Sequence, residues 1–129
     1  MYSKSALSIG GSDSGGGAGI QADLRTFMAL KVHGCSVITC ITAQNSLEVT
    51  CVEPVEKNTL LSQLDTLFAD FRIDALKTGM LLNERIINDT ASKLNTYTIT
   101  KIIDPVMVTR TGSKSVSYTH LTLPTRAQV

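Results

Sequence analysis

A glycine-rich segment follows directly on a short apolar run near the start of the chain. The run occupies residues 6–9, and six of the ten residues from Gly10 to Gly19 are glycine. A helical pattern begins at once, with apolar side chains spaced for one face: Ile20, Leu24, Phe27 and Met28. A glycine-rich turn between a strand and a helix brings backbone N–H groups close to a ligand. The alternative is a flexible connecting loop, but such loops usually span only about 2–6 residues.

The spacing of these glycines excludes two familiar nucleotide sites. No three of them follow the GxGxxG spacing of a dinucleotide-binding turn, and no GxxxxGK[ST] motif occurs. Asp13 and Asp23 also disfavour a bare phosphate here, unless a metal or a lysine offsets their charge. The segment therefore predicts a site for a different small molecule.

Strand and helix patterns alternate along the rest of the chain. Helices are predicted at residues 20–30, 56–71 and after the N-cap Asn83, and strands at 36–41, 74–78, 98–103 and, as an edge or flap strand with Pro54, 49–55. Gly34 suits a stop for the first helix. This alternation predicts a three-layer α/β/α fold with a mostly parallel sheet. Polar residues 42–46 then follow a strand at the edge where such sheets bind ligands.

Composition narrows the class of protein. The 129 residues, 43% hydrophobic and 18% charged, suit one globular domain, and no apolar run approaches a membrane span. A net charge of +1 without a basic cluster gives no indication of nucleic-acid binding. The first residues lack an apolar signal core, which favours the cytoplasm.

The three cysteines lie in apolar stretches of the sequence. Cys35, Cys40 and Cys51 lack the paired CxxC spacing of a zinc site, and His33 is a poor fourth ligand. We therefore expect buried free thiols and no metal site.

Four motifs occur in order: GSDSGGGAGIQAD, GCSVITCITAQNS, DALKTGML and DPVMV. Together they resemble the bacterial hydroxymethylpyrimidine kinase/phosphomethylpyrimidine kinase family of thiamine biosynthesis, in the ribokinase-like superfamily. The resemblance runs from about residue 5 to about residue 114. It implies a transferase that uses ATP and Mg²⁺ to phosphorylate 4-amino-5-hydroxymethyl-2-methylpyrimidine and then its monophosphate. It also implies a small-molecule partner, and it is compatible with a homodimer.

The resemblance assigns substrate-binding roles to two polar residues. Gln44 would read the aminopyrimidine edge, because one planar amide both donates and accepts hydrogen bonds. The alternative is a solvent-facing loop glutamine. Asp23 would accept a hydrogen bond from the hydroxymethyl group. Alternatively, it only stabilises a helix N-terminus.

Four further residues complete the expected pocket. Gly11 and Ala18 would contact the substrate through backbone, and Met80 and Val106 would flank its ring, unless these two are simply core. Two other functions stay open. A pyridoxal-type kinase of the same superfamily binds a similar hydroxymethyl-bearing ring, and a non-catalytic pyrimidine-binding module needs no nucleotide site.

The resemblance covers only the N-terminal half, approximately, of such a kinase. The magnesium motif, the second anion-binding loop and its catalytic residue lie beyond the equivalent of Lys114, so we expect no catalytic residue, weak or no ATP binding and no turnover from this chain. Residues 1–115 are predicted to be part of a kinase domain. Residues 116–129 resemble a translated sequencing adapter and are predicted to be a non-native tail.

Overall fold

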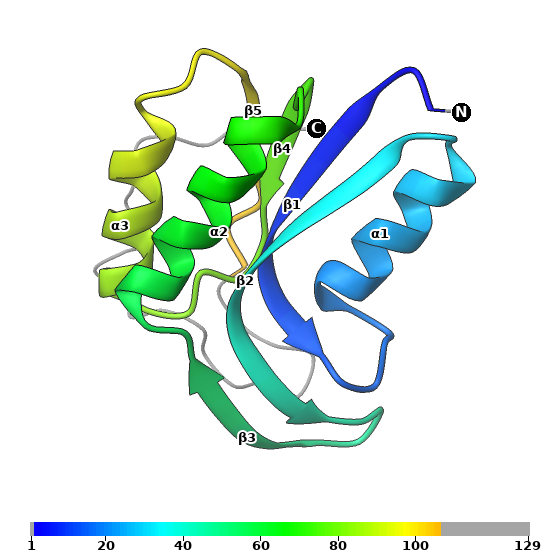
Figure 1. Ribbon diagram of the computed structural model, residues 1–129. Helices are drawn as coiled ribbons and strands as arrows, with labels where there is room; N and C mark the ends of the chain where they lie inside the picture. Colours follow the sequence, from blue (N-terminus) through cyan, green and yellow to red (C-terminus); the bar gives the residue numbers. More distant parts are fainter. Residues whose placement is uncertain (1, 107–129) are drawn as a thin grey trace.

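The computed structural model describes residues 2–106, and within them the chain forms five strands and three helices (Figure 1). In chain order these elements are β1 (Ser5–Asp13), α1 (Gly19–Ala29), β2 (His33–Gln44), β3 (Val49–Pro54), α2 (Lys57–Asp70), β4 (Ala75–Thr78), α3 (Glu84–Leu94) and β5 (Thr100–Ile103). One sheet contains all five strands in the order β3-β2-β1-β4-β5.

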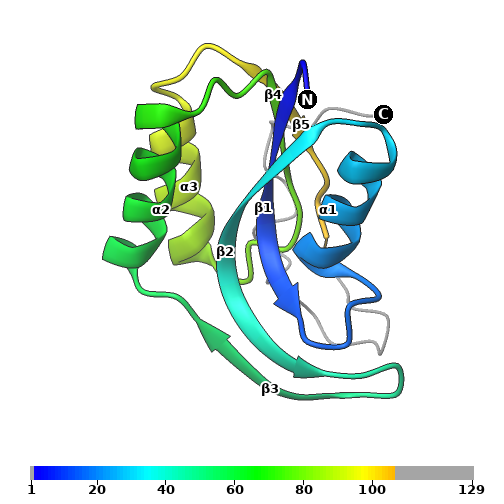
Figure 2. The same cartoon turned by 45° about the vertical axis from the view of Figure 1, so that its right-hand side comes forward.

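The sheet is wound in both directions from β1. β1 pairs in parallel with β2 on one side and with β4 on the other, β4 pairs in parallel with β5, and only β3 is antiparallel. Helix α1 covers one face, and α2 and α3 cover the other (Figures 1 and 2). The predicted three-layer, mostly parallel α/β/α fold is thereby confirmed, with β3 as the predicted edge strand.

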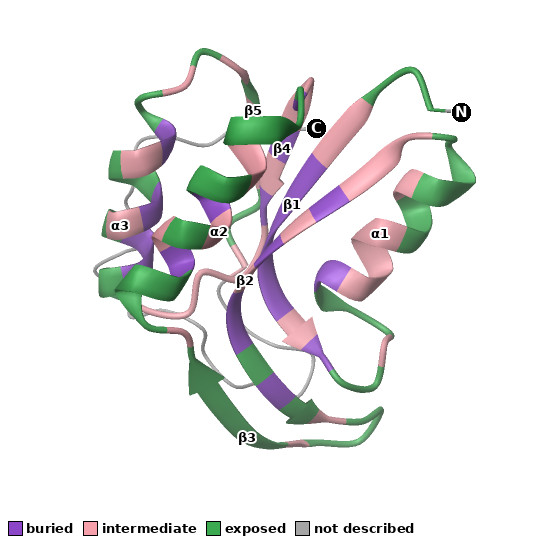
Figure 3. Ribbon diagram, in the orientation of Figure 1, coloured by how far each residue is buried: buried purple, intermediate pink, exposed green. Residues whose placement is uncertain are grey.

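The main core lies between the sheet and the α2–α3 layer. Its fully buried members come from β1, β2 and these two helices: Leu7, Ile9, Val37, Leu60, Leu64 and Ile86. Figure 3 shows the buried stretches running along the central strands. Burying side chains of this size contributes about 1.5–3 kcal/mol each. The core on the opposite face of the sheet is smaller, because α1 contributes one buried residue to it, Ile20.

Strand β2 is longer than the predicted strand at residues 36–41. It continues to Gln44, because β3 folds back on its second half and supplies antiparallel partners, with a register shift between Ala43 and Gln44. Residues 42–44 are therefore part of the strand, whereas the sequence analysis placed them in a polar cluster after it.

Gly34 does not end the first helix. Helix α1 ends at its C-cap Leu30, followed by Lys31 with a φ of 59°, and Gly34 lies within β2. A Cβ at Gly34 would lie 2.8 Å from Leu24 Cδ2, so the glycine lets α1 approach the sheet closely. The other predicted boundary is confirmed, since the Asn83 side chain accepts a hydrogen bond from Ile86 N at 2.9 Å.

The cysteines differ from expectation at one position. Cys35 and Cys40 are buried free thiols, but Cys51 is exposed because β3 is an edge strand without a covering layer. Among the helices of the described residues, none is both long and apolar enough to cross a membrane. The predicted tail at residues 116–129 lies outside the described part of the chain.

Candidate functional site

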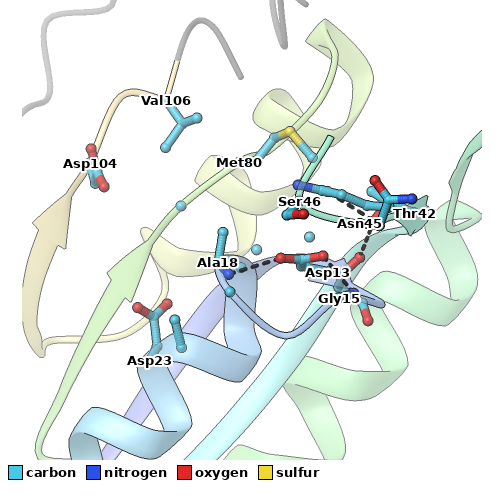
Figure 4. A pocket seen from close by; sticks show the side chains of 18 of the residues that line it. Asp13, Gly15, Ala18, Asp23, Thr42, Asn45, Ser46, Met80, Asp104 and Val106 are labelled. Carbon is cyan, nitrogen blue, oxygen red and sulfur yellow. Dashed lines mark hydrogen bonds between the residues drawn. The ribbon is translucent and has the colours of Figure 1, made fainter. Parts of the chain in front are cut away.

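A cavity of about 440 Å³ opens at the carboxyl ends of the parallel strands (Figure 4). It lies where the winding of the sheet reverses, between the adjacent strands β1 and β4, which is where open α/β sheets bind ligands. Its volume falls in the range of pockets for small molecules. The residues that line it come from the glycine-rich loop, the start of α1 and the ends of four strands: Gly10, Gly11, Ser12, Asp13, Gly15, Gly17, Ala18, Gly19, Ala22, Asp23, Thr42, Gln44, Asn45, Ser46, Lys77, Gly79, Met80, Asp104 and Val106.

Asp13 organises the glycine-rich loop. Its carboxylate is buried, and it accepts one hydrogen bond from Gly15 N at Oδ1 and one from Ala18 N at Oδ2, each 2.8 Å long. Its carbonyl oxygen accepts a third from Gly16 N at 3.0 Å. Charge-assisted bonds of this kind are roughly twice as strong as neutral ones. The aspartate therefore shapes the turn, and two backbone donors stabilise its charged carboxylate.

Two glycines have neighbouring atoms close to the position of a Cβ. Gly19, at the start of α1, has a φ of +62°, and a Cβ there would lie 2.5 Å from Gly11 O. A Cβ at Gly11 would lie 2.9 Å from Met80 Cε and 3.0 Å from Cys40 Sγ. Glycine is thus required at position 19, where a Cβ would meet backbone, whereas at Gly11 in β1 a Cβ would displace the Met80 side chain.

Side chains from neighbouring elements hold the loop in place. Gln21 Oε1 accepts a hydrogen bond from Asp13 N, and its Nε2 donates to Ser12 Oγ. Ser14 Oγ bonds both the carbonyl oxygen and the N–H of Gln44, each at 2.7 Å. The Arg25 guanidinium donates to the carbonyl oxygen of Gly16. The loop is therefore a built element tied to α1 and β2, and the alternative of a flexible connector is not supported.

Gln44 reaches the cavity from the end of β2. Its Oε1 lies 3.2 Å from Thr42 Oγ1, but Thr42 has one hydroxyl proton and makes the shorter contact, 2.8 Å, with Ser12 O. Within residues 2–106, Gln44 Nε2 donates to no protein acceptor. The amide oxygen is consequently next to Thr42, and Nε2 can donate hydrogen bonds to a ligand.

Asp23 is part of an ion pair that crosses the layers. Lys77 Nζ of β4 and Ser8 Oγ of β1 both donate to Asp23 Oδ2, at 2.9 and 2.7 Å. The first turn of α1 contains no acidic residue, so Asp23 does not act as a helix N-terminal carboxylate. The alternative assigned to it in the sequence analysis is therefore wrong.

The structure brings all six predicted substrate-binding residues to the same cavity: Gly11, Ala18, Asp23, Gln44, Met80 and Val106. Sequence reasoning missed Lys77 and the loop-organising role of Asp13. A signal for Lys77 was present in the sequence, since it is the one charged residue among the four residues of β4.

The thiol of Cys40 lies beside this site, because a Cβ at the cavity residue Gly11 would lie 3.0 Å from Cys40 Sγ. Burial raises the pKa of the Cys40 thiol, and a hydrogen bond with Thr39 acts in the opposite direction as the smaller effect. Among residues 2–106, no three His, Cys, Asp or Glu side chains are grouped so that they could hold a metal ion.

The fold and the site define a doubly wound α/β protein with a small-molecule pocket at the point where the winding reverses. A sequence model described as phosphomethylpyrimidine kinase matches residues 13–124, and the chain belongs to this family. The hydroxymethylpyrimidine/phosphomethylpyrimidine kinase of Synechococcus elongatus is 56% identical over 108 residues, which are 84% of this chain and 41% of that protein.

Solved structures show the same likeness. The crystal structure of phosphomethylpyrimidine kinase from Clostridium difficile 630 has a TM-score of 0.83 and 41% identity, over 89% of this chain and 50% of that one. The pyridoxal kinase of Staphylococcus aureus in complex with AMP-PCP and pyridoxal has a TM-score of 0.71 and 36% identity, over 81% and 40%. The chain therefore spans about two fifths to one half of the length of each of these three proteins.

Proposed function

We propose that this chain provides the acceptor pocket of a kinase that phosphorylates 4-amino-5-hydroxymethyl-2-methylpyrimidine and then its monophosphate in thiamine biosynthesis. The observation that carries this proposal is the convergence of the Gln44 amide, the Asp23 carboxylate and the ordered glycine loop on one cavity. Family membership supports it. Because the chain spans 41% of the Synechococcus relative, the activity is proposed for the complete enzyme.

In the proposed complex, Gln44 pairs with a ring nitrogen and the neighbouring exocyclic amine of the pyrimidine. One amide carries both the donor and the acceptor that this edge needs. Asp23 accepts a hydrogen bond from the hydroxymethyl group. Met80 and Val106 flank the ring, and the backbone at Gly11 and Ala18 approaches it, consistent with their positions around the cavity.

The charge distribution also suits the monophosphate as the second acceptor. Two carboxylates near a glycine loop would repel a phosphate if their charge were not offset. The Lys77 ammonium offsets the charge of Asp23, and hydrogen bonds from the backbone N–H groups of Gly15 and Ala18 stabilise the Asp13 carboxylate. The lysine that the sequence analysis named as a condition for anion binding is thus present at the pocket.

We further propose that the ATP and Mg²⁺ sites of the complete enzyme lie beyond the equivalent of Lys114, as the resemblance to the kinase family implies. When bound, ATP would supply the phosphoryl group and Mg²⁺ would neutralise its charge. The contribution of this chain is to bind and orient the acceptor. We further propose a cytoplasmic enzyme and, in its complete form, a homodimer.

A pyridoxal-type kinase is the second candidate, favoured by the structural likeness to the Staphylococcus aureus protein. A substrate panel separates the two kinases. A non-catalytic pyrimidine-binding module is the third candidate. In that case the completed protein would bind the pyrimidine with the same affinity whether or not ATP is present.

The proposal is tested by completing the chain. Residues 1–115 are joined to the remaining part of the Synechococcus relative, and product is measured by mass spectrometry with ATP, Mg²⁺ and the hydroxymethylpyrimidine. We expect monophosphate and then diphosphate from the completed protein, and no product from the 129-residue chain. Turnover by the short chain would show that the catalytic groups lie within it. A completed protein that phosphorylates pyridoxal but not the pyrimidine would favour the second candidate.

A further inference from the structure

Lys77 and Ser8 hold Asp23 by a single oxygen. Ser8 and Lys77 are direct partners in the parallel pairing of β1 with β4, and their side chains both reach the α1 face of the sheet. Each donates to Asp23 Oδ2, at 2.7 Å from Ser8 Oγ and 2.9 Å from Lys77 Nζ. Two adjacent strands thus fix one side chain of the helix above them.

The burial of the three groups differs in a way that matters for binding. Ser8 is fully buried, whereas the side chains of Lys77 and Asp23 keep 24% and 27% of their surface exposed and line the cavity. Gly79 leaves room for the lysine, because a Cβ there would lie 3.1 Å from Lys77 Nζ. Of the three hydrogen-bonded residues, Ser8 is therefore buried in the sheet, and Lys77 and Asp23 are accessible from the cavity.

With both donors on Oδ2, the other oxygen of Asp23 stays free. Within residues 2–106, Asp23 Oδ1 accepts no hydrogen bond from a protein group. Figure 4 shows the Asp23 carboxylate at the cavity, on the side opposite to Asn45 and Ser46. A carboxylate fixed through one oxygen presents the second in a defined direction, which is what binding a single hydroxyl group requires.

We propose that Lys77 and Ser8 are positioning residues that orient Asp23, so that its Oδ1 accepts a hydrogen bond from the hydroxyl group of the acceptor substrate. This inference rests on the proposed function and adds two residues to it. A purely structural tie between α1 and β4 is the competing explanation. The two differ in one respect: positioning affects only ligands that carry the hydroxyl group.

Two ligands separate these explanations by calorimetry on the 129-residue chain. One is 4-amino-5-hydroxymethyl-2-methylpyrimidine, and the other is 4-amino-2,5-dimethylpyrimidine, which lacks only the hydroxyl. We expect Lys77→Met to weaken the first by about tenfold, the effect of one misdirected hydrogen bond to a charged group, and to leave the second within about twofold. Ser8→Ala should show the same selectivity with a smaller loss.

Lys101→Met is the matched control. Lys101 lies on the neighbouring strand β5, donates to Tyr97 O and is not part of the cavity lining, so its loss should leave both affinities unchanged. If Lys77→Met does not fold by circular dichroism, Ser8→Ala carries the same comparison.

Equal weakening of both ligands, or of neither, would overturn the positioning role while leaving the pyrimidine site in place. If 4-amino-5-hydroxymethyl-2-methylpyrimidine does not bind the unchanged, folded chain, the proposed function and the inference with it are overturned.

Discussion

Asp13 Oδ2 accepts a hydrogen bond from Ala18 N at 2.8 Å and so closes the glycine-rich loop on itself. The same carboxylate binds Gly15 N through its other oxygen. Both backbone groups border the cavity, so the conformation of the loop and the shape of the pocket depend on one buried side chain.

Replacing Asp13 with asparagine should therefore destabilise the chain. An amide NH₂ cannot accept the bond that one carboxylate oxygen receives, and a buried donor left unpaired costs about 1–3 kcal/mol. We expect a loss of this size in the free energy of unfolding, measured by urea denaturation. The exposed Asp70→Asn in α2 is the control and should stay within about 0.5 kcal/mol. Equal stability of Asp13→Asn and the unchanged chain would refute the organising role of Asp13.

The glycines of the loop should differ sharply in their tolerance of alanine. Gly19→Ala places a Cβ 2.5 Å from Gly11 O at a φ of +62°, whereas the nearest atom to a Cβ at Gly17 is 4.0 Å away. The unfavourable φ alone costs about 1–2 kcal/mol. We expect Gly19→Ala to lower the melting temperature by several degrees and Gly17→Ala to leave it nearly unchanged. Similar melting temperatures for the two variants would contradict the loop geometry.

Gln44→Ala should weaken pyrimidine binding with little effect on folding. Ligand groups left unpaired in the pocket cost about 1–3 kcal/mol, which corresponds to roughly ten- to hundredfold in affinity. Gln63→Ala is the matched control. The Gln63 amide binds the backbone of Ile38 at 2.8 and 2.9 Å, outside the cavity, so its loss should lower stability and spare affinity. Unchanged affinity in Gln44→Ala by calorimetry would remove this residue from the site.

The thiols should react in the order of their exposure. Cys51 is exposed, whereas burial raises the pKa of the Cys35 and Cys40 thiols. Iodoacetamide at pH 8 should label Cys51 alone in the native chain, as read by mass spectrometry, and Cys51→Ser should remove this labelling. Rapid native labelling of Cys40 would show that the pocket side of β2 is open to reagent.

The same thiols give a pH dependence of stability. A thiol whose pKa is raised by folding stays protonated in the native state while the unfolded chain ionises near the ordinary value of 9.0. Ionisation then favours the unfolded chain, so the contribution of these thiols to the free energy of unfolding should be constant below this value and should fall as pH rises above it. Replacing Cys40 with valine should reduce this fall, measured by urea denaturation between pH 7 and 10.

Much of the fold could be predicted from local patterns. The alternation of strands and helices, the N-cap at Asn83 and the edge strand with Pro54 depend on short stretches of sequence. The length of β2 could not be predicted this way, because its second half is a strand only through pairing with β3. The exposure of Cys51 has the same origin, since an apolar neighbourhood in sequence does not reveal which face of an edge strand is covered.

The six pocket residues were predicted from the resemblance to the kinase family and not from their spacing in the sequence. All six predicted residues line the cavity, yet the ion pair between Lys77 and Asp23 joins positions 54 residues apart. No spacing rule connects such a pair. The parallel pairing of β1 with β4 places Lys77 on the face of the sheet that α1 covers. This pairing joins segments that are distant in the sequence, so local patterns do not predict it.

The assignment of the cavity as an acceptor site can be tested by calorimetric titration of the 129-residue chain. The ligand is 4-amino-5-hydroxymethyl-2-methylpyrimidine, and pyridoxal is titrated in parallel. We expect one pyrimidine to bind per chain, more tightly than pyridoxal, with the preference lost in Gln44→Ala. Binding of pyridoxal as tight as that of the pyrimidine, or no pyrimidine binding by a chain that is folded by circular dichroism, would contradict the assignment of this cavity as the acceptor site.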